Sequence, residues 1–227
     1  MTTPLTSVVP EGRIRGGVIV IQEAFGITDY IVDVCSRFAA AGYHAVAPHL
    51  FHRGGDPVLA YDDLKTAMPL LGTLTSAHID EDVDAAVDAL SEASIDSAST
   101  AIVGFCMGGT VAFHTAVRLE LGAAVSFYGG GVEKGRFGYP SQLDAARQLS
   151  TPWLGLFGDR DKGIPSERVE ELRDALSQVP VGTEIVRYPD AEHGFHCDDR
   201  PAVYNEEAAA DAWSRTLVWL DTHVSTA

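Results

Sequence analysis

Short apolar runs alternate with longer amphipathic segments along this chain, and that order constrains the fold more than any other feature. The runs lie at residues 17–22, 43–48, 99–103, 123–128, 153–157 and 183–188. They are rich in apolar and β-branched residues, which is typical of strands buried on both faces. Six strands alternating with helices predict a single α/β domain over residues 1–227, with a mostly parallel sheet covered on both faces.

Helical periodicity fills most of the segments between these runs. Helices are expected at residues 29–42, 62–71, 79–93, 107–119, 167–178 and 206–223, and Pro69 should disturb the end of the second. Residues 129–150 are expected to form a long loop, and loops of that length are commonly functional or disordered.

Charge and cysteine content exclude several classes of partner. The net charge of −16 repels nucleic acid and anionic membranes. No stretch approaches the roughly 20 apolar residues that span a bilayer, and residues 1–17 lack the apolar segment of a secretory signal. The three cysteines, Cys35, Cys106 and Cys197, are an odd number without such a signal, so we expect reduced thiols and a cytoplasmic location.

The strongest local motif is Gly104-Phe-Cys106-Met-Gly108-Gly109, between a predicted strand and a predicted helix. It has the Gly-x-nucleophile-x-Gly pattern of a nucleophile elbow, with cysteine in place of serine. The two flanking glycines lack the Cβ atoms that would clash across so sharp a turn. The helix N-terminus would also lower the thiol pKa from its ordinary value of about 8.5. Cys106 is therefore the candidate nucleophile.

An elbow of this kind predicts the chain order nucleophile, acid, histidine. His193 follows the last predicted strand and can carry the proton of the thiol. Asp159 and Asp161 compete as the carboxylate that orients it. Asp161 is favoured because it lies further out in the turn, where Ile164 and Pro165 begin the next helix behind it.

Glu23 ends the first apolar strand, so it is either a solvated turn residue or an active-site carboxylate. Its strand leads into the loop that supplies one oxyanion N–H in proteins with such an elbow. The expected donors are the backbone N–H groups of Ala24 and Met107.

Together these motifs resemble the dienelactone hydrolase family. The matching pieces are residues 22–26, 104–109 and 127–129, Gly158 with Asp161 and Pro165, and residues 193–195. The resemblance implies an α/β-hydrolase fold and a Cys106-His193-Asp161 triad that acts on an ester or lactone through an acyl thioester. It also implies that Glu23 contacts the thiol and assists its ionisation when substrate binds. The pocket candidates are Phe25, Phe105, Tyr128, Phe195 and Cys197.

The chain departs from the family pattern in several places. Family members that act on dienelactone hold its carboxylate with arginines, and one of them lies four residues after the catalytic histidine, where this chain has Cys197. The region 61–74, where another is expected, offers only Lys65. Dienelactone itself is therefore not the expected substrate. Arg53, Arg160 and Arg200 are left open as substitutes for the missing carboxylate-binding arginines. His49 stands where the family usually has aspartate. The N-terminal edge of the sheet is also expected to be shortened.

Other functions remain open at this level. The same scaffold could serve as a ligand-binding or redox-sensing protein, the latter with a Cys106–Cys197 pair, or as an acyl transferase using the thioester. The pairs His49–His52 and His193–His196 lack the i, i+4 spacing of a helical zinc site, so we expect no metal and no cofactor. The expected partner is a small-molecule ester or lactone, with the protein as a monomer or small homo-oligomer.

Overall fold

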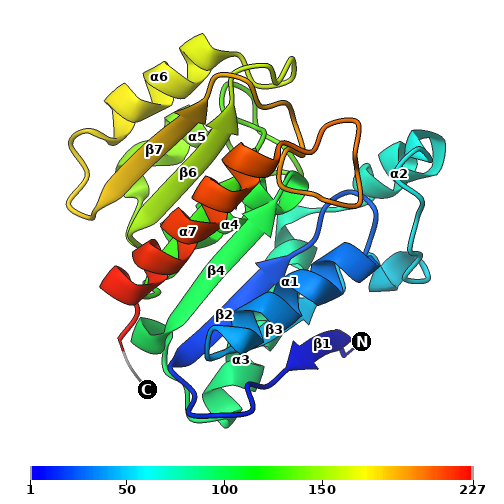
Figure 1. The fold of residues 1–227 in the computed structure, drawn as a ribbon, viewed down its shortest axis with the longest axis vertical. Coiled ribbons are helices and arrows are strands. Elements are labelled where there is room, and N and C mark those ends of the chain that lie inside the picture. Colours follow the sequence, from blue (N-terminus) through cyan, green and yellow to red (C-terminus); the bar gives the residue numbers. More distant parts are fainter. Residues whose placement is uncertain (1, 226–227) are drawn as a thin grey trace.

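Residues 2–225, which the computed structural model describes, form one seven-stranded sheet in the order β1-β3-β2-β4-β5-β6-β7 (Figure 1). The strands are β1 (Leu5–Val8), β2 (Gly16–Ile21), β3 (Tyr43–Pro48), β4 (Thr100–Phe105), β5 (Ala123–Phe127), β6 (Trp153–Gly158) and β7 (Thr183–Tyr188). All neighbouring strands are parallel except β1, which runs antiparallel to β3. The prediction of a mostly parallel sheet is confirmed.

Helices cover both faces of this sheet. They are α1 (Asp29–Ala40), α2 (Leu64–Leu71), α3 (Ser76–Glu92), α4 (Met107–Arg118), α5 (Gln142–Ala145), α6 (Ser166–Leu176) and α7 (Glu206–His223), with short 3-10 turns η1 (His52–Gly54), η2 (Ser97–Ser99) and η3 (Ala146–Gln148). Helices α1 and α7 pack on one face, which Figure 1 shows in front, while α3, α4 and α6 pack on the other. None of the helices in residues 2–225 is long and apolar enough to cross a membrane.

The strands read as unbroken apolar runs because both of their faces are buried. In β2, Ile19 and Ile21 point toward α3 and α4, whereas Val18 and Val20 point toward α1 and α7. All four side chains are fully buried. Cys35 of α1 is also buried in this second core.

The first strand was not predicted. β1 has four residues, Leu-Thr-Ser-Val, and none of them is buried. A short edge strand with one solvated face carries too little apolar pattern to be recognised, because it is defined by its pairing with β3. The N-terminal edge of the sheet consists of this short strand, so the edge is small but present.

Two further segments differ from expectation. The end of the predicted loop at 129–150 is helical, because α5 and η3 occupy residues 142–148. The Ser141 hydroxyl starts that helix by accepting from the N–H of Asp144. Pro69 lies inside α2 rather than ending it.

Candidate active site

The turn after β4 holds Cys106 in a strained backbone conformation, with φ 57° and ψ −115°. A Cβ at Gly104 would lie 1.9 Å from the carbonyl oxygen of Gly108, and a Cβ at Gly108 would lie 2.4 Å from that of Ile21. Neither neighbour can move away cheaply, because both are backbone atoms. The Cys106 N–H donates to the carbonyl of Phe127 at 3.1 Å, which ties the turn to β5. The two glycines thus meet the requirement that the motif predicted.

The loops after β6 and β7 bring Asp161 and His193 together. The Nδ1 atom of His193 lies 2.6 Å from Oδ2 of Asp161, whose side chain is only 3% exposed. The other oxygen, Oδ1, accepts from the Gly163 N–H at 2.8 Å. Asp159 points elsewhere and forms two bonds to Arg187, at 2.7 and 2.8 Å. The structure therefore places Asp161, and not Asp159, against the histidine.

The His193 ring interacts electrostatically with Cys106 as well as with Asp161. Burial alone would lower the pKa of His193, but its interactions with Cys106 and with the Asp161 carboxylate raise it to about 10. The imidazolium form of His193 is therefore favoured at neutral pH. Cys106 is half-buried, whereas Cys35 and Cys197 are buried.

Glu23 follows β2 and faces the same site. Its side chain is 2% exposed, and neither carboxylate oxygen has a hydrogen-bond partner within the described residues. Burial raises the pKa of Glu23, while the charges of Arg200 and His193 act to lower it. A buried carboxylate without hydrogen bonds is costly in a folded protein and is a common mark of a functional site.

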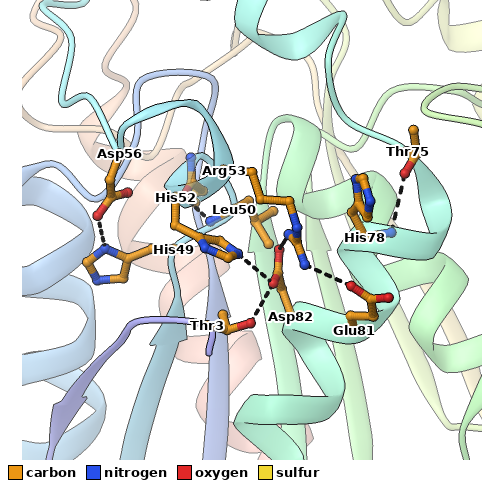
Figure 2. A network of polar contacts seen from close by, with 11 residues as sticks. Thr3, His49, Leu50, His52, Arg53, Asp56, Thr75, His78, Glu81 and Asp82 are labelled. Atoms are coloured by element: carbon orange, nitrogen blue, oxygen red, sulfur yellow. Dashed lines mark hydrogen bonds and ion pairs between the residues drawn. The ribbon is translucent and has the colours of Figure 1, made fainter. Parts of the chain in front are cut away.

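Of the three arginines left open by the sequence, Arg200 alone lies beside Glu23. Its Nη1 atom is 3.9 Å from Oε1 of Glu23. The guanidinium also lies over two aromatic rings, 5.8 Å from the centroid of Phe25 and 5.6 Å from that of Tyr61. Arg53 is instead bound by Asp82 and Glu81 (Figure 2), and Arg160 is an exposed partner of Asp190.

The two expected oxyanion donors have N–H groups available. Ala24 forms no hydrogen bond through its N–H within residues 2–225. Met107 is the first residue of α4, so its N–H has no intrahelical acceptor. Both residues are buried, and they flank the elbow from β2 and β4.

Three of the five predicted pocket residues lie at or near the site, and two lie in the core. Phe25 and Tyr128 lie at the site, because Phe25 packs edge-on against Tyr61 at 4.9 Å and the Tyr128 ring centroid is 5.1 Å from that of His193. Cys197 is buried near Glu23, and burial raises its thiol pKa to about 12. The remaining two, Phe105 and Phe195, are fully buried in the aromatic core around Phe127.

Tyr61 was not singled out in the sequence, because it lies in a loop without periodicity. A buried polar network holds this loop in place (Figure 2). Asp82 of α3 accepts from the Thr3 hydroxyl at 2.6 Å and from Arg53 at 2.7 Å, and it lies 3.0 Å from Nε2 of His52. The network fixes the chain directly after β3. Further along the same loop, the Tyr61 hydroxyl lies 3.1 Å from that of Thr28, and its ring packs against Phe25 at the site.

The histidine pairs considered as metal ligands have other partners. Nδ1 of His49 lies 2.6 Å from Asp56, as Figure 2 shows, and Nδ1 of His196 lies 2.6 Å from the Tyr30 hydroxyl. Within the part of the chain that the structure describes, no three histidine, cysteine or acidic side chains are grouped to hold a metal ion.

Comparison with known proteins identifies the family. Residues 6–224 match the model of the "Dienelactone hydrolase family". The chain belongs to this family. It is 40% identical over 205 residues to a Salmonella typhimurium protein named "Putative carboxymethylenebutenolidase", covering 89% of this chain and 75% of that protein. A Bradyrhizobium protein named "Probable 2-oxo-3-(5-oxofuran-2-ylidene)propanoate lactonase" is 33% identical over 219 residues, which are 95% of this chain and 87% of that one.

A solved structure shows the same relationship. The crystal structure of a Klebsiella pneumoniae protein named "Putative Dienelactone Hydrolase" has a TM-score of 0.88 to this chain at 37% identity, covering 96% of this chain and 92% of that one. The seven-stranded sheet is that of the α/β-hydrolase fold. The chain is therefore a carboxylic ester hydrolase of the dienelactone hydrolase type.

Proposed function

We propose that this protein hydrolyses carboxylic esters or lactones with Cys106 as its nucleophile, through an acyl thioester. One observation carries the proposal. Cys106 sits in a strained turn at the start of α4, and it faces a histidine whose other nitrogen is 2.6 Å from a buried aspartate. A nucleophile, a base and a group that orients the base are the parts that covalent acyl transfer requires.

Acylation begins from the thiolate–imidazolium pair. The Cys106 thiolate attacks the carbonyl carbon, and the N–H groups of Ala24 and Met107 donate to the oxygen that becomes negative. The tetrahedral intermediate then expels the alkoxide, which takes its proton from His193. In a lactone the alkoxide stays attached to the acyl group, so the ring opens. Asp161 holds the ring of His193 in the required orientation.

Deacylation returns the enzyme to its starting state. The neutral His193 removes a proton from water, and the hydroxide attacks the thioester carbonyl. The same two N–H groups stabilise the second tetrahedral intermediate, which expels the Cys106 thiolate and releases the acid. The imidazolium is thereby restored beside the thiolate.

Glu23 is proposed to support the charged form of the pair, as the family resemblance implies. Its carboxylate interacts electrostatically with His193, so ionised Glu23 stabilises the imidazolium. Arg200 offsets part of the cost of burying that charge, at 3.9 Å. Small lactones are the proposed substrate class, since two relatives carry the names of lactone hydrolases.

Turnover of 4-nitrophenyl acetate and of small unsaturated lactones tests the proposal. Wild-type protein should hydrolyse at least one of them, and Cys106→Ala should not. Cys35→Ala is the matched control, because it removes a buried thiol from α1 in the core that α1 and α7 cover. Acid quenching during turnover should leave an acyl adduct on the peptide that contains Cys106.

Two outcomes would contradict the proposal. Equal turnover by wild type and Cys106→Ala would exclude the thiol as the nucleophile. An ester of an added alcohol, formed in place of the free acid, would assign an acyl transferase instead.

A further inference from the structure

A cavity of about 490 Å³ opens beside His193, between residues 130–136 and the segment that leads into α6. Four cationic side chains line it: Lys134, Arg136, Lys162 and Arg168. The concentration of positive charge is unusual for this chain, whose net charge is −16. The sequence has only three lysines, and two of them are at this cavity.

Three of these cations have no carboxylate partner in the part of the chain that the structure describes. Within residues 2–225, no carboxylate pairs with Lys134, Arg136 or Lys162. Arg168 differs, because it is bonded to one glutamate on its own helix and lies 3.6 Å from another, Glu133, which also lines the cavity. The cavity therefore carries a surplus of positive charge that the protein itself does not neutralise.

The backbone around the cavity also favours an anion. Helix α6 has 11 residues and starts at Ser166, directly after lining residues Ile164 and Pro165, so its positive end is near the cavity. On the opposite wall, Gly130 leaves room for a cation, since a Cβ there would lie 2.7 Å from Nη1 of Arg136. A bulkier residue would displace the guanidinium.

We propose that this cavity binds a dianionic group, such as a phosphate monoester, on the alcohol side of the scissile ester bond. The inference rests on the proposed function and specifies the alcohol portion of the ester or lactone that the site accepts. His193 is the triad residue that lines the cavity, and it delivers its proton to the leaving oxygen, so the alcohol portion extends in this direction. Three unpaired cations exceed what one carboxylate would neutralise, which favours a doubly charged group.

This site is distinct from the region around Glu23. Neither Glu23 nor Arg200 lines the cavity, and Arg200 is engaged with Glu23 and two aromatic rings. His193 thus lies between two regions: the cavity on its alcohol side, and the Glu23 and Arg200 side chains, which do not line the cavity.

Three acetyl esters that differ only in the alcohol test the proposal: phenyl acetate, 4-acetoxybenzoate and 4-acetoxyphenyl phosphate. The measured quantity is kcat/KM for each anionic ester divided by that for phenyl acetate. A change at Lys162 that disturbs its neighbour Asp161 would lower kcat/KM for all three esters alike, so the ratio is unaffected by it. In the double variant Lys134→Ala/Lys162→Ala, we expect the ratio to fall about 100-fold for the phosphate and about 10-fold for the carboxylate, chiefly through KM.

Controls distinguish a specific loss of anion binding at the cavity from a general loss of positive charge. Lys65→Ala removes the third lysine, which is exposed on α2 away from the cavity, and should leave both ratios at the wild-type value. Raising the salt concentration should lower the phosphate ratio in wild type and much less in the double variant. An equal loss for 4-nitrophenyl succinate, whose charge is on the acyl side, would contradict the assignment to the alcohol side. An equal fall of both anionic ratios would contradict a preference for dianions.

A binding measurement separates this inference from the hydrolase proposal. Phenyl phosphate should bind to the Cys106→Ala protein in calorimetry, with a Kd about 100-fold higher once both lysines are also replaced. Equal binding with and without the lysines, or no binding at all, would overturn the inference even if phenyl acetate is hydrolysed. Lysine-dependent binding without any ester turnover would overturn the hydrolase proposal alone.

Discussion

Replacing Asp161 with asparagine tests the triad most sharply, because the surroundings of this carboxylate leave an amide only one good orientation. Oδ1 accepts from the Gly163 N–H at 2.8 Å, and Oδ2 lies 2.6 Å from Nδ1 of His193. In Asp161→Asn the amide oxygen must stay toward Gly163, since an NH₂ group there would face another donor. The NH₂ group then faces Nδ1, which can only accept.

This arrangement moves the ring proton to Nε2, the nitrogen that should exchange protons with Cys106. The histidine is then held in the wrong tautomer. The corresponding change in a serine hydrolase triad costs about 10⁴-fold in rate, so we expect a loss of about 10³ to 10⁴ in kcat/KM, or about 4–5.5 kcal/mol. Loss of the negative charge also lowers the pKa of His193, which is about 10 in the wild type. The alkaline limb of the pH–rate profile should therefore shift to lower pH.

The assay is hydrolysis of 4-nitrophenyl acetate between pH 5 and 10, with thiolate absorbance followed in parallel. Asp159→Asn is the matched control, because Asp159 follows the same strand, β6, but pairs with Arg187 at a partly exposed position. It should retain wild-type kcat/KM and lose at most about 1 kcal/mol of stability. Retention of more than a tenth of the activity in Asp161→Asn, or a large loss in Asp159→Asn, would refute the assignment.

Three further changes follow from the same geometry. Gly108→Ala places a Cβ 2.4 Å from the carbonyl oxygen of Ile21, so urea unfolding should show a loss of about 1–3 kcal/mol or more. Asp82→Ala leaves three buried or half-buried donors without their acceptor (Figure 2), and the same assay should show a loss of about 2–4 kcal/mol. Glu23→Gln removes a buried carboxyl group whose pKa is raised above 4.5 in the folded protein. Above that pH the folded wild type binds more protons than the unfolded chain, so its stability falls as pH rises. In unfolding curves between pH 5 and 8, the glutamine variant should lack this pH dependence of stability. Its kcat/KM should fall, because Arg200 loses its charged partner.

Much of the fold could be predicted because the relevant signals are local. A strand buried on both faces needs a continuous apolar run, and β2 ends in four consecutive apolar side chains that are fully buried. The elbow was recognisable for the same reason, since Gly104 and Gly108 are required by contacts within a few residues and with the adjacent strand. β1 escaped prediction because only its partner β3 defines it.

The arrangement of the site depended on tertiary structure. Asp159 and Asp161 are two residues apart at the end of one strand, and the direction of each side chain selects between them. Arg200 lies seven residues after His193, where no pattern distinguishes it from other surface arginines. Its contact with Glu23 exists because the loop after β7 folds back over the end of β2.

The cationic cavity likewise depends partly on the sequence and partly on the tertiary structure. By itself, the sequence determined that lysine is rare in an acidic chain and that the segment after β5 is long. Lys134 and Lys162 are 28 positions apart, and they reach one cavity because β5 and β6 are neighbours whose carboxyl ends meet at the same edge of the sheet. Residue type and local spacing thus specified the strands and the nucleophile turn, whereas the pairing of distant loops decided which charges face His193.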